Sequence, residues 1–504
     1  MTTAERSKTN PKAMDIGARL TFDLSRPGRK GVLLPQPDVP TAALPDARFL
    51  RSELNLPELS QNQVVRYFLG LSKLNYGLDT GFYPLGSCTM KYNPTVNEDV
   101  GRLPGFALAH PLQPEATVQG ALAVLHQLQQ ALAAITGMDA VALAPAAGAQ
   151  GELCGILMIK AYLEDHPDDN GARRKVLIPD SAHGTNPATA AMCGFQVVTI
   201  PSDRDGNTNM AALKSALDNG VAAMMLTLPS TLGLFDPNIE RIAQTLHRHG
   251  ALLYGDGANQ NAFLGRARFG DMGFDVVHLN LHKTFSTPHG GGGPGAGPVC
   301  VKATLAPYLP TPVVETNEES YSLAAPERSI GKATAFHGNF GVLVRALTYI
   351  RSLGAEGLRA ISDNAVINAN YVLTRLRRAY HLPYDRRCMH EVVFSPPKAG
   401  RQAKGAKTLD IAKRLIDYGF HPPTIYFPLI VDEALMVEPT ESEAKEALDA
   451  FCEAMLAIAR EAEEEPELLR GAPHDAPLRR LDEAAAARKP YLRWRPREDV
   501  SGTA

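Results

Sequence analysis

The chain has 504 residues, of which 44% are hydrophobic and 21% are charged. This length exceeds what a single hydrophobic core supports, so we expect an ordinary globular protein with more than one domain. The 51 basic and 54 acidic residues give a net charge of −3. Charge therefore provides no overall case for binding nucleic acid or an anionic membrane.

The six cysteines are scattered and include no CxxC pair. This pattern argues against a structural zinc site or a disulfide framework and favours a reducing compartment. The first residues lack the apolar segment of a signal peptide, and no stretch approaches the ~18 apolar residues of a membrane span. We therefore expect a cytoplasmic protein.

The first part of the chain predicts an arm, a loop and a helix. Residues 1–60 are polar and proline-rich, which indicates an extended arm that either wraps a partner or is disordered. Residues 78–94 carry too many glycines, prolines and hydroxyl groups for a regular element, so they are a candidate functional loop. An amphipathic helix is expected over 116–136, ended by Gly137.

Strands and helices then alternate, which indicates right-handed crossovers and a mostly parallel sheet covered by helices. Such sheets bind ligands at the carboxyl ends of their strands, where His183, Asp256 and Lys283 all fall. The expected strands cover 140–144, 176–178, 196–200, 222–228, 251–254 and 276–281.

Lys283 follows the last of these strands and lies between His282 and Thr284, with four consecutive glycines at 290–293 beyond it. A desolvated lysine near other cationic groups is suited to Schiff-base chemistry. A surface lysine beside a flexible turn is the ordinary alternative for such a stretch taken alone.

Residues 145–160 predict a turn of small residues that opens a helix. Free backbone N–H groups at a helix start can bind an anion or a phosphate group. The pattern is neither a Walker A motif nor a dinucleotide fingerprint, and tight packing of small residues explains it equally well.

After about residue 340 the pattern becomes that of a smaller α+β domain, whose last helix is expected to follow a capping box at Thr440–Glu443. A short basic stretch near the end favours a surface-packed tail over nucleic-acid binding. The expected divisions are an N-terminal arm (1–60), a large domain (61–340), a small domain (341–464) and a tail (465–504).

Together these features match the requirements of pyridoxal 5′-phosphate: a lysine, a carboxylate and a histidine at neighbouring strand ends, and a helix start for the phosphate. No metal site is expected. Four motifs also resemble the glycine cleavage system P-protein family: Tyr83–Pro94, Ala182–Ala188, Asp256–Asn259 and the stretch from His282 to Gly295.

The resemblance covers nearly the whole chain from about residue 60 and implies the fold-type-I, aminotransferase-like α/β architecture with a smaller C-terminal domain. By length, the chain is similar to subunit 2 of the split form, the catalytic half of the long P-proteins. The resemblance implies decarboxylation of glycine and transfer of the aminomethyl group to the lipoyl arm of H-protein. It also implies a subunit 1 partner, most simply with two copies of each subunit.

Carried over by position, the resemblance implies that Lys283 forms the Schiff base with pyridoxal phosphate. Asp256 would pair with the pyridine nitrogen, and His183 would stack on the ring. The phosphate group would bind at the helix start. The residues implied there are Gly148, Ala149 and Gln150.

His282 and His289 are candidates by position for the acid that reprotonates carbon or sulfur, although either could simply hydrogen-bond to backbone in the turn. Two departures from the family pattern, Leu228 in place of an expected asparagine and the stretch 332–339, concern the substrate pocket. They leave the cofactor assignment unchanged.

Two alternatives remain at this stage. Another fold-type-I enzyme, such as an aminotransferase or an amino-acid decarboxylase without a lipoyl acceptor, would share every cofactor residue. A regulatory or scaffolding subunit with a relic site is the non-enzymatic alternative, which the intact Lys283, Asp256 and His183 oppose.

Overall fold

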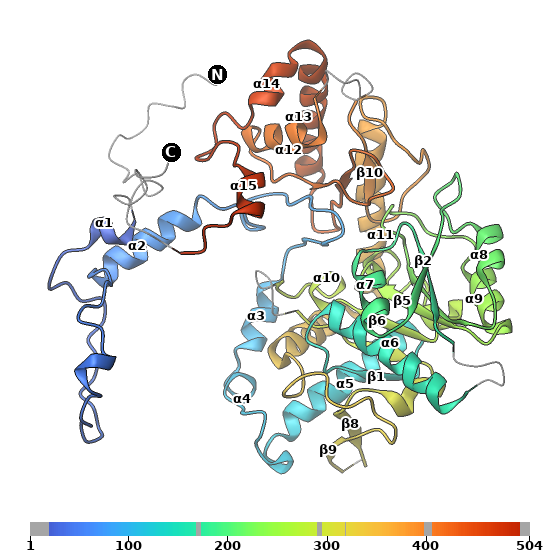
Figure 1. The fold of residues 1–504 in the computed structure, drawn as a ribbon, viewed down its shortest axis with the longest axis horizontal. Coiled ribbons are helices and arrows are strands. Elements are labelled where there is room, and N and C mark those ends of the chain that lie inside the picture. Colours follow the sequence, from blue (N-terminus) through green and yellow to red (C-terminus); the bar gives the residue numbers. More distant parts are fainter. Residues whose placement is uncertain (1–19, 168–172, 290–294, 318, 398–405, 494–504) are drawn as a thin grey trace. The chain divides into compact units, whose positions relative to one another are not determined.

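The alternating segments form a seven-stranded sheet in the computed structural model, which describes residues 20–167, 173–289, 295–317, 319–397 and 406–493 (Figure 1). The strand order is β1-β7-β6-β5-β4-β2-β3. All neighbouring pairs from β3 to β6 are parallel, and β7 is antiparallel to both β6 and β1. The expected mostly parallel sheet is confirmed. Its strands are β1 (Ala140–Ala142), β2 (Lys175–Pro179), β3 (Gln196–Ile200), β4 (Val221–Thr227), β5 (Leu252–Gly257), β6 (Val276–Leu279) and β7 (Val299–Val301).

Helices cover both faces of this sheet because side chains along each buried strand alternate between two cores. Val176, Met225 and Val276 pack with α6 and α7 on one face. Leu177 and Met224 pack with α5, α8, α9 and the first part of α11 on the other. The helices are α5 (Gln119–Thr136), α6 (Gly148–Asp165), α7 (Thr185–Met192), α8 (Met210–Ala216), α9 (Ile239–Arg248) and α11 (Phe340–Leu376).

The first turn of α6 packs unusually closely against the segments around β6 and β7. A Cβ atom on Gly151 would lie 2.3 Å from the carbonyl oxygen of Gly297, and one on Gly148 would lie 2.0 Å from the Asn280 side chain. Only glycine permits such an approach. The contact brings the amino end of α6 to the carboxyl end of β6.

The strand that leads to Lys283 is shorter than expected. It ends at Leu279, and a short helix, α10 (Leu281–Thr284), carries the lysine. The turn forms because the backbone amides of Lys283 and Thr284 donate to the carbonyl of Asn280 at 3.0 and 3.2 Å. Asparagine is a favoured residue at a helix start, a signal that the apolar pattern of the strand obscured. The four glycines at 290–293 lie outside the described residues.

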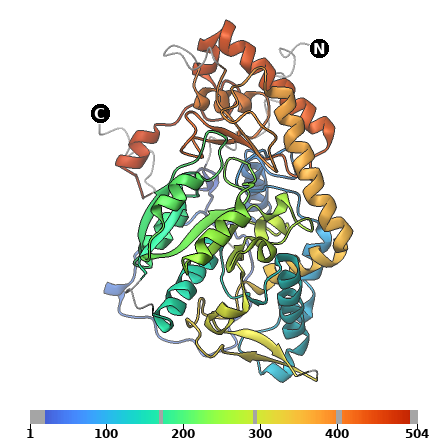
Figure 2. The same cartoon turned by 90° about the vertical axis from the view of Figure 1, so that its right-hand side faces the viewer.

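The C-terminal part builds a second core beyond a kink in α11 at Gly354, where φ is 61° and ψ is −174°. Figure 2 shows α11 as a long orange helix that leads to the C-terminal helices. The expected capping box at Thr440 is wrong: Thr440 has φ 61°, and the helix begins at Lys445. The elements are β10 (Val392–Phe394), β11 (Thr424–Ile425) and β12 (Leu435–Val437), paired β10-β12-β11, with α12 (Thr408–Asp417), α13 (Lys445–Glu464) and α14 (Pro466–Gly471).

The chain divides into two compact units, one formed by 1–80 with 475–504 and the other by 81–474. The expected large and small domains thus both fall largely in the second unit. The first unit contains the expected arm together with most of the expected tail. Along the described ranges, no helix has the length and apolar character needed to cross a membrane. The remaining elements of the first unit are α1 (Thr21–Leu24), α2 (Gln61–Ser72) and α15 (Glu483–Arg488). Those of the second unit are α3 (Thr95–Gly101), α4 (Pro104–Ala107), β8 (Val313–Thr316) and β9 (Tyr321–Ala324). The described residues also form short 3₁₀ helices at Ala47–Phe49, Glu115–Thr117, Gln260–Ala262, Phe269–Met272 and Ala303–Tyr308.

The contact at Gly151 predicts a matched pair of stability effects. We expect Gly151→Ala to lower the free energy of unfolding by roughly 1–3 kcal/mol, because the methyl group has no room against the Gly297 backbone. Gly120→Ala, in the first turn of α5 with nothing within 4 Å, is the control. It should leave stability unchanged or raise it by up to about 1 kcal/mol. Urea unfolding followed by circular dichroism measures both; equal midpoints would contradict the packing argument.

Candidate active site

A cavity of about 360 Å³ opens at the carboxyl ends of β2, β4, β5 and β6. Lys283, Asp256 and His183 all line it, as do Gly148 and Ala149 at the start of α6. The parallel strands deliver the three predicted side chains to one edge of the sheet, which is why residues a hundred positions apart meet here. Gln150 is turned away: its side chain bonds to the amide of Ala146 and the carbonyl of Ala333.

Lys283 is held by its own short helix. In the amide orientation that satisfies its hydrogen bonds, Asn280 accepts from Nζ of Lys283 at 3.2 Å and donates to Nε2 of His278 at 3.3 Å. Asn280 is 6% exposed, so its position is fixed by packing. The amine of Lys283 therefore has a defined place in the cavity wall.

Asp256 is a buried carboxylate with several partners. It accepts from the amide of Ala258 at 3.0 Å and from Asn186 at 3.3 Å, and Nε2 of His278 lies 3.4 Å away. Burial raises the pKa of Asp256, but His278, the Ala258 amide, Lys283 and Asn186 together hold this pKa below its usual value. Asp256 is therefore ionised at neutral pH and can pair with a protonated ring nitrogen.

His183 lies in the loop between β2 and α7. Its Nδ1 is 2.9 Å from Oγ1 of Thr185, and its ring meets that of Phe427 edge-on at 5.6 Å between centroids. Loss of solvent around the imidazole lowers the pKa of His183, an effect that Asp256 opposes and Lys283 adds to. The imidazole is consequently neutral near pH 7, the state in which a flat ring stacks without charge.

The start of α6 offers an anion site. Gln150 and Gly151 are the first amides to bond within the helix, to the carbonyl of Ala147, which leaves those of Gly148 and Ala149 for a ligand. Two buried polar atoms in the cavity wall, Oγ1 of Thr227 and Oδ1 of Asn259, also have no partner among the described residues. A flat, phosphate-bearing cofactor with polar ring substituents fits this wall.

His282 and His289 meet edge-on at 5.0 Å at the rim of the cavity. Burial lowers the pKa of His282 to about 3, and the charges of His289 and Lys283 act in the same direction. Burial and Lys283 likewise lower the pKa of His289. Nδ1 of His282 accepts from the amide of Ala296 at 3.4 Å, so its ring is held by backbone in the turn. Both imidazoles are neutral, and their roles as acids stay predictions.

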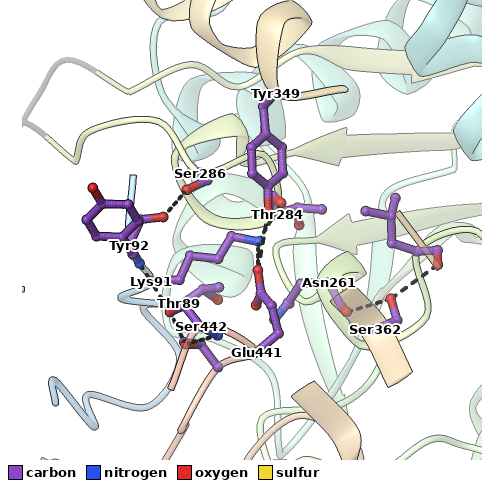
Figure 3. Close-up of polar contacts among 12 residues, drawn as sticks. Thr89, Lys91, Tyr92, Asn261, Thr284, Ser286, Tyr349, Ser362, Glu441 and Ser442 are labelled. Atoms are coloured by element: carbon purple, nitrogen blue, oxygen red, sulfur yellow. Dashed lines mark hydrogen bonds and ion pairs between the residues drawn. The ribbon is translucent and has the colours of Figure 1, made fainter. Parts of the chain in front are cut away.

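The candidate loop at 78–94 is held against Lys283 by buried charges. Nζ of Lys91 donates to the carbonyl of Thr284 at 2.8 Å and to Glu441 at 2.9 Å, beneath the ring of Tyr349 (Figure 3). Burial lowers the pKa of Lys91, but Glu441 and Tyr349 raise it above its usual value. Lys91 thus bonds to the last carbonyl group of α10, one residue beyond Lys283.

Two further carboxyl groups fix the same loop. Glu391 accepts from the amide of Ser87 at 2.8 Å, and Glu438 accepts from the amide and hydroxyl of Thr89 at 2.9 and 2.6 Å. Ser87 and Thr89 have φ values of 62° and 50°, a conformation that needs such support. Burial raises the pKa of both glutamates, the mutual repulsion adding to that of Glu391.

Sequence analysis missed several cavity residues: Glu152, Thr185, His278 and Asn280. Thr185 stands inside the Ala182–Ala188 motif, which was a signal available in the sequence. His278 lies within an apolar strand pattern and looks like a core residue. The two family departures do not line the cavity: Leu228 is fully buried in the main core. Asn339, at the end of the stretch 332–339, donates to the carbonyl of Gly295, which does line it.

The sheet order, the lysine on a turn after β6 and the anion site on α6 define a fold-type-I, aminotransferase-like protein. Residues 155–389 match the family described as aminotransferase class-V, and residues 361–476 match that described as glycine dehydrogenase, C-terminal domain. The fold also resembles a solved glycine decarboxylase (P-protein) of the glycine cleavage system in inhibitor-bound form, with a TM-score of 0.67, 20% identity and coverage of 88% of this chain and 96% of that one. A sphingosine-1-phosphate lyase from Burkholderia pseudomallei gives a TM-score of 0.61 at 13% identity, covering 82% of this chain and 94% of that one.

The chain belongs to the family of glycine dehydrogenase (decarboxylating) subunit 2. A "probable glycine dehydrogenase (decarboxylating) subunit 2" from Desulforamulus reducens is 58% identical over 95% of this chain and 99% of its own length. The protein of that description from Halalkalibacterium halodurans is also 58% identical, over 95% of this chain and 99% of its own length. The expected fold class and family are confirmed.

The Lys91 cluster predicts a large stability effect. We expect Lys91→Met to lower the free energy of unfolding by roughly 3–5 kcal/mol, since it leaves the Glu441 carboxylate buried without its cation. Lys445→Met removes an exposed partner of Asp449 and should change stability by no more than about 0.5 kcal/mol. Chemical denaturation of the two variants tests this. Equal losses would show that the buried pair does not hold the loop.

Proposed function

We propose that this chain is the catalytic subunit of a glycine dehydrogenase that uses pyridoxal 5′-phosphate to decarboxylate glycine and passes the aminomethyl group to the lipoyl arm of H-protein. The observation that supports this most is the meeting of Lys283, Asp256 and His183 at one cavity beside the start of α6. The family named for its relatives points to the same reaction.

The residues have separate tasks in this proposal. Lys283 would hold the cofactor through its amine, the amides of Gly148 and Ala149 would bind the phosphate, and His183 would cover the ring. Bound pyridoxal phosphate supplies an electron sink for the bond that breaks at the amino acid. Asp256, kept ionised by its partners, would hold the pyridine nitrogen protonated.

The neutral state of the nearby histidines is consistent with this chemistry. Because the pKa values of His282 and His289 are lowered, neither imidazole places a second positive charge beside the lysine that would hold the cofactor. We place the enzyme in the cytoplasm, in keeping with its free cysteines.

The exchange of labelled carbon dioxide into glycine tests the function. We expect exchange that depends on added H-protein, and a loss of roughly 10²-fold or more in Lys283→Ala because the cofactor loses its covalent anchor. Lys214→Ala, at an exposed position of α8, is the matched control and should keep full activity. Exchange that ignores H-protein would favour another fold-type-I decarboxylase. Full activity in Lys283→Ala would refute the site.

Exposed apolar side chains in the first compact unit support the proposal of a partner subunit. Large apolar side chains there are exposed, including Leu33 at 86%, Leu34 at 83% and Phe49 at 71%. Val65, Phe68 and Leu69 on α2 are also exposed. Such concentrations of exposed apolar surface mark protein interfaces. We propose that the subunit 1 chain covers them, with two copies of each subunit.

Co-expression with subunit 1, followed by size-exclusion chromatography with light scattering, tests the assembly. We expect a stable complex of both chains, because obligate interfaces commonly bury more than ~2,000 Å². Phe68→Asp should weaken the complex by placing a charge in the apolar surface, whereas Arg66→Gln on the same helix changes the net charge by the same one unit and is the control for charge alone. A fully active assembly of this chain by itself would refute the proposal.

A further inference from the structure

Three polar side chains of the cavity form one hydrogen-bonded chain. Glu152, just beyond the first turn of α6, is 1% exposed, and its Oε2 lies 2.9 Å from Oγ1 of Thr185. The same Oγ1 lies 2.9 Å from Nδ1 of His183. All three residues line the cavity. One hydroxyl group therefore links a buried carboxyl group to the imidazole that covers the ring site.

The hydroxyl group of Thr185 has a single proton, so the chain can exist in two arrangements. If Glu152 is ionised, Thr185 donates to the carboxylate and must accept from Nδ1–H of His183, which leaves Nε2 without a proton. If Glu152 is protonated, it donates to Thr185, and Thr185 donates to Nδ1, which places the imidazole proton on Nε2. The protonation of Glu152 thus determines the tautomer of a neutral His183.

Two contacts favour the second arrangement. The backbone amide of Thr185 also donates to Nδ1 of His183, at 3.2 Å, which requires Nδ1 to be an acceptor. In addition, Oε1 of Glu152 is buried and has no hydrogen-bond partner among the described residues. An ionised carboxylate with one oxygen left unpaired in the interior is disfavoured.

The surrounding charges act in the same direction. Burial, followed by the charge of Asp256, raises the pKa of Glu152 to about 7, although Thr189, Thr185 and Asn186 oppose the rise. Loss of solvent lowers the pKa of His183, which keeps its imidazole neutral while Glu152 titrates. The titratable groups that interact with Glu152 are Asp256 and Tyr254 on β5 and Cys193 at the end of α7. His183, His278 on β6 and Lys283 on α10 line the same cavity.

The free nitrogen of His183 is available to a bound molecule. Among the described residues Nε2 has no hydrogen-bond partner, and the side chain is exposed to the cavity. His282 also accepts from a backbone amide through Nδ1, but among the described residues no carboxyl group is bonded through a hydroxyl group to its ring. Nε2 of His183 is therefore open to the cavity, while Nδ1 is connected through the hydroxyl group of Thr185 to the carboxyl group of Glu152.

We propose that Glu152 stores a proton and delivers it through Thr185 to Nε2 of His183, which makes His183 the proton donor of the site and Glu152 and Thr185 its positioning residues. The inference rests on the proposed function, in which carbon or sulfur becomes negatively charged during the reaction and must receive a proton.

The transfer is balanced and involves no oxidation. Nε2 of His183 gives its proton to the negatively charged atom, while Nδ1 takes the proton of the Thr185 hydroxyl group. Oγ1 of Thr185 takes the proton of Glu152 in turn. The imidazole ends neutral with its proton on Nδ1, and Glu152 ends as a carboxylate. A proton taken up by Nε2 of His183 from solvent or substrate reverses these transfers and protonates Glu152 again.

The experiment follows the tautomer of His183 in the full chain labelled with ¹⁵N-histidine, using His183→Gln to assign its signals. We expect Nε2–H below about pH 7 and Nδ1–H above it, because Glu152 ionises there. Infrared difference spectra should show the C=O stretch of one protonated carboxyl group disappear over the same interval. In Glu152→Gln that band is absent and the tautomer stays Nε2–H on both sides, since the amide always donates to Thr185.

The hydroxyl group is tested separately. In Thr185→Val the tautomer of His183 should no longer follow the carboxyl group, and H-protein-dependent exchange should fall by roughly 10²–10⁴-fold, whereas Thr185→Ser should retain both properties. Glu240→Gln, in the first turn of α9, is the control for charge. A His183 tautomer that is unchanged across pH 7, or that changes equally in Glu152→Gln, overturns the proposal. The spectra need neither glycine nor H-protein, so their outcome is independent of whether the proposed reaction is correct.

Discussion

The close approach of α6 to the backbone beyond β6 and β7 is the contact on which the site depends. Because Gly148 and Gly151 have no side chains, the helix start reaches the edge of the sheet, with Gly297 and Asn280 against it. That single contact places the free amides of α6, the carboxyl group of Glu152 and the amine of Lys283 around one cavity. A side chain at either glycine would separate the anion site from the lysine.

The same contact forces charges into the interior, where each must be paired. Asp256 remains ionised because donors and His278 surround it, whereas burial and the charge of Asp256 raise the pKa of Glu152 to about 7 despite the opposing effect of Thr189, Thr185 and Asn186. The two carboxyl groups of one cavity therefore lose their protons in separate pH ranges. In the proposed function, this separation would let Asp256 neutralise a cofactor charge while Glu152 supplies a proton.

The C-terminal part of the chain contributes to the site without lining the cavity. Glu391, Glu438 and Glu441 all bond to the loop at 81–94, and Lys91 of that loop bonds to the end of α10. Residues more than 300 positions apart thus fix the short helix that carries Lys283. A loop with positive φ values and no regular structure keeps its shape only because these buried groups satisfy its amides.

The sequence by itself determined the sheet, its order of alternating elements and the shared edge where Lys283, Asp256 and His183 meet, because strand patterns are local and parallel strands end on one side. The family motifs supported the prediction of the cofactor. Local patterns could not show that β6 ends before Asn280. They also could not show that Thr440 does not cap a helix, or that the side chain of Gln150 faces away from the cavity. The tertiary structure alone decided that Glu152 meets Thr185 and Asp256, since protonation inside a protein depends on neighbours brought from distant parts of the chain.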